Sequence, residues 1–132
     1  MFTWNEVSPY FRVEEIVSPE TWGMVHLVDV EALKALNRLR GVLGVACLVN
    51  VPGSGLRLRG LRSWKEQEGL VEKGLTKAKF SMHCLGKAFD VSAPGRELDE
   101  IANAAKAVGF SYVLVYPGNG FVHMDMRTVW RD

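Results

Sequence analysis

The sequence has 132 residues, of which 48% are hydrophobic and 23% are charged, and its formal net charge is +1. This length predicts a single domain spanning residues 1–132 around one hydrophobic core. The charge shows no bias toward an acidic polymer, so overall charge gives no support to nucleic acid as a partner, and none is expected.

The chain shows no sequence signal for export or for membrane insertion. Its N-terminus lacks the basic and apolar regions of a secretion signal, and no window reaches the ~18 apolar residues of a membrane span. Cys47 and Cys84 lie in apolar contexts without CxxC spacing, so buried thiols are expected. We therefore expect synthesis in the cytoplasm, no membrane partner and a monomer.

The first half of the chain is expected to be mainly helical. Short outer helices are predicted over residues 1–24, where the Ser-Pro pair at 18–19 fits an N-cap followed by proline. Asp29 is a plausible N-cap for a longer helix, which Gly41 or Gly44 should end. One apolar face of that helix is formed by Ala32, Leu36, Leu39 and Leu43. Their steps of four, three and four residues are typical of a helix.

The middle of the chain is less regular. The valine-rich apolar run at 45–50 predicts a buried strand, which the Val-Pro-Gly-Ser-Gly segment at 51–55 ends. Residues 56–80 mix arginine and lysine with glutamate and three glycines. The commonest meaning of such a stretch is a solvated loop with a short helix. The functional alternative is a cleft wall that offers cations to an anionic substrate group.

The sequence of the last third of the chain predicts a strand, a helix and a hairpin. Residues 87–92 read as a strand ended by a turn. Residues 98–108 hold the helical period of apolar residues until Gly109. The β-rich runs at 111–116 and 121–127 flank Pro-Gly-Asn-Gly, whose turn chemistry predicts a hairpin.

Two histidines and an aspartate among apolar residues are candidate metal ligands: His83, Asp90 and His123. On the last strand the two-residue period places His123 and Asp125 on one face, opposite the core. His83 and Asp90 are seven positions apart, and an odd step reverses the face of a strand. His83 should therefore approach Asp90 from a loop, with Gly86 supplying the bend.

Zinc accepts histidine nitrogen and carboxylate oxygen, and a catalytic zinc keeps three protein ligands with a fourth position open for water. It lowers the pKa of that water to about 7 and polarises a carbonyl, which is the chemistry of amide hydrolysis. The alternative is that both histidines are ordinary structural residues and Asp90 is a turn or cap residue. Three dispersed ligands are less specific than an HExxH motif.

The candidate ligands lie within two longer motifs. The first is SxHxxGxAxD over residues 81–90, and the second is GFVHxDxR over residues 120–127, just after the Tyr116-Pro117 turn. In this order and context they resemble the M15 zinc peptidases, especially the D-alanyl-D-alanine carboxypeptidase-like and phage lysin domains. The match covers roughly residues 30–130.

This resemblance implies the fold class and the cofactor. The fold expected from it is α+β, a small and mostly antiparallel sheet with helices packed on one side, which the hedgehog signalling domain shares. The cofactor expected from it is Zn²⁺, held by His83, Asp90 and His123. The substrate expected from it is a bacterial cell-wall peptide.

The resemblance also implies residues that contact substrate. The segment Gly-Leu-Arg-Ser at 60–63 looks like the family's Gly-Tyr-Arg-Ser, so Arg62 is expected to bind a substrate carboxylate or to support the developing oxyanion. Ser81 and Tyr116, which belong to the matching segments, are further expected substrate contacts.

Asp125 has two possible roles. Several branches of the family carry the catalytic base two or three residues before the last zinc histidine, where this chain has Phe121 and Gly120. Neither residue can accept a proton, which makes Asp125 the best candidate for proton transfer. The competing role is to orient a metal ligand by a hydrogen bond.

The leading expectation is a zinc peptidase that hydrolyses an amide bond beside a D-amino acid in peptidoglycan, as a carboxypeptidase or an endopeptidase. A phage or prophage lysin, delivered through a holin or a tail, would fit the missing export signal. The alternative is a non-catalytic, metal-containing domain that binds wall peptides or serves as a phage component. Nucleic-acid binding through residues 57–79 is weaker, since glutamates interrupt the basic stretch and only Trp64 and Phe80 offer stacking.

Overall fold

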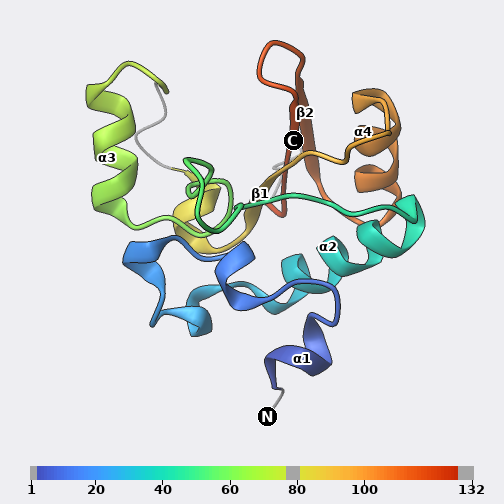
Figure 1. Ribbon diagram of the computed structural model, residues 1–132, viewed down its shortest axis with the longest axis horizontal. Coiled ribbons are helices and arrows are strands. Elements are labelled where there is room, and N and C mark those ends of the chain that lie inside the picture. The colour runs from blue at the N-terminus through green and yellow to red at the C-terminus, as the bar shows by residue number, and fades with distance from the viewer. Residues whose placement is uncertain (1–2, 77–80, 128–132) are drawn as a thin grey trace, which may run out of the picture.

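The computed structural model describes residues 3–76 and 81–127, so Lys77, Lys79 and Phe80 of the basic stretch lie outside the described residues. Figure 1 shows the order of the elements along the chain. The larger elements are α1 (Trp4–Val7), α2 (Val30–Leu43), α3 (Trp64–Glu72), β1 (Ala88–Val91), α4 (Leu98–Ala107), β2 (Tyr112–Tyr116) and β3 (Phe121–Asp125). Between them lie the 3-10 helices η1 (Val13–Glu15), η2 (Pro19–Thr21), η3 (Val25–Leu27) and η4 (Met82–Leu85).

The strands form an antiparallel sheet in the order β1-β3-β2. The predicted hairpin is present as β2 and β3, although β3 ends at Asp125 and not at Arg127. The register of β1 against β3 places Asp90 directly opposite His123. Directly opposite residues on neighbouring strands lie about 5 Å apart, so the sheet itself brings two candidate ligands together.

Helices cover one face of the sheet. Helix α4 packs on β2 and β3, and α2 packs on α4. Val122 and Met124 of β3 are fully buried on this side, as are Ile101 and Ala105 of α4. Burial of such apolar side chains is the main favourable term in folding. The expected α+β architecture, a small antiparallel sheet with helices packed on one side, is confirmed.

The two long helices begin and end where the sequence predicts. The Asp29 carboxylate accepts a hydrogen bond from the backbone N–H of Ala32 at 2.9 Å, and Gly44 ends α2 in the left-handed conformation. Helix α4 begins after Glu97 and ends before Gly109.

Within the described ranges, no helix is both long and apolar enough to cross a bilayer.

The strand predicted over residues 45–50 is wrong. Leu48 makes one isolated bridge with Ser92, and no ladder continues from it. Two residues on, the Asn50 side chain bonds the Val17 carbonyl and the Arg59 backbone N–H. This segment is therefore a partly buried loop, and apolar content alone does not distinguish such a loop from a buried strand.

The expected irregular segment at 56–80 contains one short helix, α3. The Ser63 side chain accepts from the backbone N–H of Glu66, and the Glu66 carboxylate accepts from that of Ser63, which is a capping box. Immediately before α3, Leu61 pairs with Val17 and its N–H bonds the Ile16 carbonyl. Residues 60–63 are thereby fixed against the N-terminal segment.

Gly86 ends η4 in the left-handed region, with φ of 69°, and its backbone touches the N-terminal segment. A Cβ at this position would lie 1.9 Å from the Leu27 carbonyl oxygen. We expect Gly86→Ala to lower the free energy of unfolding by about 2 to 4 kcal/mol, because the clash adds to the backbone strain. Chemical denaturation measures this loss.

Gly95→Ala is the matched control, because Gly95 has φ of 88° and nothing within 4 Å of an added Cβ. That variant carries the backbone strain without the clash, and we expect a loss of about 1 kcal/mol. Equal losses in the two variants would show that the contact with Leu27 does not matter.

Candidate metal centre

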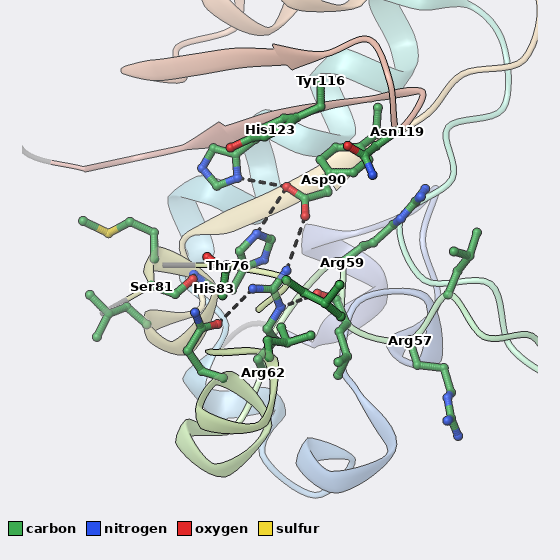
Figure 2. A pocket seen from close by; sticks show the side chains of 18 of the residues that line it. Arg57, Arg59, Arg62, Thr76, Ser81, His83, Asp90, Tyr116, Asn119 and His123 are labelled. Carbon is green, nitrogen blue, oxygen red and sulfur yellow. Dashed lines mark hydrogen bonds and ion pairs between the residues drawn. The ribbon is translucent and has the colours of Figure 1, made fainter. Parts of the chain in front are cut away.

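The three predicted ligands converge at one point. His83 comes from η4, Asp90 from β1 and His123 from β3, and one ligand atom of each lies within 4.8 Å of the other two. Figure 2 shows both imidazole rings directed at the same oxygen of the Asp90 carboxylate. As predicted, His83 lies outside the strand that carries Asp90, in a turn that Gly86 ends.

In each histidine, one ring nitrogen contacts the Asp90 carboxylate and the other is hydrogen-bonded to an oxygen of a different residue. His83 Nδ1 lies 2.9 Å from the Gly60 carbonyl oxygen, and its Nε2 lies 3.3 Å from Asp90 Oδ1. His123 Nε2 lies 2.7 Å from Asp125 Oδ2, and its Nδ1 lies 2.9 Å from the same Asp90 Oδ1. The carbonyl of Gly60 accepts an N–H, so Nε2 is the nitrogen of His83 that is left for a cation.

This arrangement fits a divalent cation. Two imidazole nitrogens and a carboxylate oxygen are a donor set that suits zinc. Histidines that bind a metal usually donate their other N–H to a carbonyl or a carboxylate, which fixes the tautomer and the ring orientation. Gly60 and Asp125 supply these two acceptors for His83 and His123. His83 Nε2, Asp90 Oδ1 and His123 Nδ1 are therefore the atoms that would hold the ion.

The charges of the three groups differ strongly. Burial lowers the pKa of His83, so its ring is neutral. Burial alone would raise the pKa of Asp90, but its contacts with His83 and His123 hold that pKa well below the usual range. Burial also opposes protonation of His123, yet the hydrogen bonds with Asp125 and Asp90 raise its pKa to about 9. Without a metal, His123 is therefore a cation between two carboxylates.

Metal uptake is expected to release about one proton per ion at neutral pH, because His123 coordinates only as a neutral ring. With a metal-free pKa of about 9 for His123, apparent affinity should fall about tenfold for each pH unit below that value. Competition with a chelating indicator between pH 6 and 8 measures this slope, after correction for the indicator's own protonation. An affinity that does not change with pH would contradict a protonated His123.

Asp125 lies behind His123 and not in the cleft. Its side chain is fully buried, although it lies on the strand face predicted to be chemical. Arg127 covers it, with Nη2 2.7 Å from Oδ2 and Nε 2.9 Å from Oδ1. Burial alone would raise the pKa of Asp125, but its hydrogen bonds with His123 and Arg127 lower it to about 2. Asp125 is thus an ionised hydrogen-bond acceptor that fixes the His123 ring.

Arg62 borders the centre from the other side. Its Nη2 lies 3.4 Å from Asp90 Oδ2, and its Nη1 donates to Gln67 Oε1 at 2.9 Å. Its Nε donates to the Leu58 carbonyl. Arg62 therefore holds the Asp90 oxygen that faces away from the histidines, and the position of Asp90 depends on both neighbours.

A cleft of about 850 Å³ opens over the three ligands. Among the predicted substrate contacts, Arg62, Ser81 and Tyr116 line it. The Ser81 hydroxyl accepts the His83 backbone N–H at 3.2 Å. The Tyr116 ring stacks on Phe121 with centroids 5.0 Å apart. Burial, followed by the nearby charge of Asp90, raises the pKa of Tyr116, so its hydroxyl is protonated at neutral pH.

Positively charged side chains predominate among the charged residues that line the cleft. The arginines that line it are Arg57, Arg59, Arg62 and Arg127. Among the described lining residues, Asp90 is the only carboxylate. This supports the functional alternative for residues 56–80, a wall that presents cations to an anionic group.

Several residues that shape the site were missed from the sequence. The Gly60 carbonyl holds His83, Gln67 holds Arg62, and Arg127 holds Asp125. The alternation of His123, Asp125 and Arg127 on one strand face was a usable signal for the last of these. The sequence gives no signal for the roles of Gly60 and Gln67, because the side chains that they hold lie on other elements.

Comparisons with known proteins agree with this geometry. The family model described as peptidoglycan L,D-endopeptidase MepK, one of the M15 peptidase models, matches residues 23–131. Among solved structures, the chain is similar to the crystal structure of Serratia marcescens L-Ala D-Glu endopeptidase ChiX. That similarity has a TM-score of 0.56 and 21% sequence identity, and it covers 87% of this chain and 92% of that one. No curated protein sequence matches the chain.

Proposed function

Because this chain belongs to the M15 peptidase family, we propose that it is a zinc-dependent endopeptidase that cleaves an amide bond beside a D-amino acid in bacterial cell-wall peptides. The family resemblance of the two motifs is confirmed, and with it a metallopeptidase that acts on cell-wall peptides. The matching family model and the similar structure are both described as endopeptidases, which favours an internal bond over removal of a C-terminal residue.

One observation carries the proposal: the two histidines and Asp90 converge on the floor of a cleft, with both histidines already oriented by other oxygens. Zinc is the proposed ion, since this N,N,O donor set matches catalytic zinc sites. When bound, it would supply an activated water and polarise the carbonyl of the peptide. Preorganised ligands of this kind cost little reorganisation when an ion binds.

The other polar residues of the cleft would position the peptide. The protonated Tyr116 hydroxyl is proposed to donate a hydrogen bond to a substrate oxygen, since it lines the cleft and stacks on Phe121. Ser81 acts on the site by capping η4 and so placing His83. For Asp125, the contacts with His123 and Arg127 support the orienting role over proton transfer.

Arg62 is proposed to contact substrate directly. Arginine has five N–H groups, and Leu58, Gln67 and Asp90 bind three of them. The remaining two have no hydrogen-bond partner among the described residues, so we propose that they bind a carboxylate or a developing oxyanion in the cleft. Arg62→Lys should lower kcat/KM by about 10- to 100-fold with unchanged metal content, because an ammonium cannot reproduce the planar fork.

Kinetic assays and metal analysis of the same preparation test this prediction for Arg62. Unchanged kcat/KM would remove Arg62 from the reaction. Loss of metal along with activity would assign it instead to holding Asp90, to which it is bonded at 3.4 Å.

The function itself is tested by digesting purified peptidoglycan with the zinc-loaded protein, with and without a chelator. Mass spectrometry of the soluble fragments identifies the bond that is cut. New peptide termini that appear only without chelator support the proposal, and a lost C-terminal D-amino acid alone would indicate a carboxypeptidase. Retention of the protein on peptidoglycan with no released fragment would indicate the non-catalytic binding domain.

A further inference from the structure

One arginine of the cleft differs from its neighbours in its partners. Arg62 is bonded to Asp90, and Arg127 to Asp125. Arg57 is exposed. Arg59 is half-buried and ordered by contacts, yet no described carboxylate lies within ion-pair distance of it. A charge that lines a cleft and has no described carboxylate partner is available to an anionic ligand.

Both the backbone and the guanidinium of Arg59 are held by contacts. Its backbone N–H donates to Asn50 Oδ1 at 2.8 Å, and its carbonyl accepts the N–H of Asp90 at 2.8 Å. Its guanidinium lies 4.9 Å from the centroid of the Phe121 ring, and its Nη1 donates to Ser92 Oγ at 3.2 Å. Ser92 is itself anchored, since its hydroxyl donates to the Gly120 carbonyl at 2.9 Å.

Among the described residues, Ser92 is the only hydrogen-bond partner of the Arg59 guanidinium, so its remaining N–H groups are open to a ligand. Stacking on Phe121 occupies a face of the group, and Ser92 takes one of its five N–H donors. A guanidinium stacked on an aromatic ring with open N–H groups is suited to bidentate recognition of a carboxylate. Figure 2 shows its guanidinium on the Asn119 side of the cleft, away from His83 and Ser81.

We propose that Arg59 binds a carboxylate of the substrate peptide and selects acidic cell-wall peptides over their carboxamide forms. The proposal rests on the function proposed above and assigns a specificity to it. The backbone bond from Asp90 to Arg59 places this carboxylate subsite next to the ligand strand, on the side of the β2-β3 turn. A peptide whose carboxylate is bound by Arg59 and whose chain extends along the cleft would have its scissile bond placed over the metal ligands.

The test uses a synthetic peptide, N-acetyl-L-Ala-γ-D-Glu-L-Lys-D-Ala-D-Ala, and two derivatives in which either the D-Glu carboxylate or the C-terminal carboxylate is amidated. We expect amidation of one of these groups to lower kcat/KM of the zinc-loaded wild type by about 10- to 100-fold. Arg59→Gln should lose this preference, and Arg59→Lys should keep a smaller part of it. Dissociation constants measured by calorimetry in the presence of a chelator should show the same preference without hydrolysis.

Arg40→Gln is the matched control. Arg40 is also a half-buried arginine stacked on an aromatic ring, 5.0 Å from the Tyr10 centroid, but it lies on α2 and does not line the cleft. This variant should keep the wild-type preference. If the wild type cleaves the peptides and the preference is absent, or is equal in Arg59→Gln, the assignment of Arg59 is overturned and the peptidase function stands. If the wild type neither cleaves nor binds any of them, the assignment of Arg59 fails, and digestion of purified peptidoglycan decides the peptidase function separately.

Discussion

His83→Ala is expected to lose its bound divalent cation and to lower peptide hydrolysis by about three orders of magnitude or more, since polarisation by a metal is worth several kcal/mol. His83 supplies one of the three converging ligand atoms, and its ring is fully ordered by the Gly60 carbonyl. Elemental analysis of the purified variant and kinetic assay of the same sample measure the two losses. Chelation of the wild type should reproduce the kinetic loss and be reversed by added zinc.

His26→Ala provides the control, because His26 is an exposed histidine of η3 outside the cleft. It should keep both metal and activity. Since His83 is buried, its removal also leaves a cavity, so thermal unfolding must show that the variant is folded at the assay temperature. A folded His83→Ala protein with wild-type metal content and turnover would refute the site.

Asp125→Asn is expected to weaken zinc binding by about 10- to 100-fold, with activity partly restored by excess metal. The physical reason is its place in the structure: Asp125 is fully buried and accepts from His123 at 2.7 Å and from Arg127 at 2.7 Å. An amide keeps the shape but removes the negative charge, so it orients the His123 ring less well. Zinc affinity and kcat are measured over a range of added metal.

The competing role of Asp125 gives a different result. If Asp125 transfers the proton, Asp125→Asn should lower the chemical rate by about two to four orders of magnitude with zinc fully bound. Asp99→Asn is the control, because Asp99 is an exposed residue of α4. Full activity and full zinc occupancy in Asp125→Asn would leave this residue with neither role and turn attention to Tyr116.

Much of the fold was predictable because it follows from local patterns. The cap at Asp29 and the apolar period that ends at Leu43 predicted α2, and the run before Gly109 predicted α4. The β-rich runs around Pro117-Gly118-Asn119-Gly120 predicted the hairpin. In these segments the hydrogen bonds form between near neighbours, so residue type and spacing are enough. The run at 45–50 failed because its partners are distant loops.

For the site, the sequence by itself determined which residues can act as ligands and that His83 must approach from a turn. It also placed His123 and Asp125 on one strand face. Only the tertiary structure decided that Gly60 holds His83, and that Arg59 lies in the cleft without a carboxylate partner among the described residues. These facts depend on how residues 56–63 pack between the N-terminal segment and β1. That packing comes from side-chain and backbone contacts across long sequence separations, which no periodicity encodes.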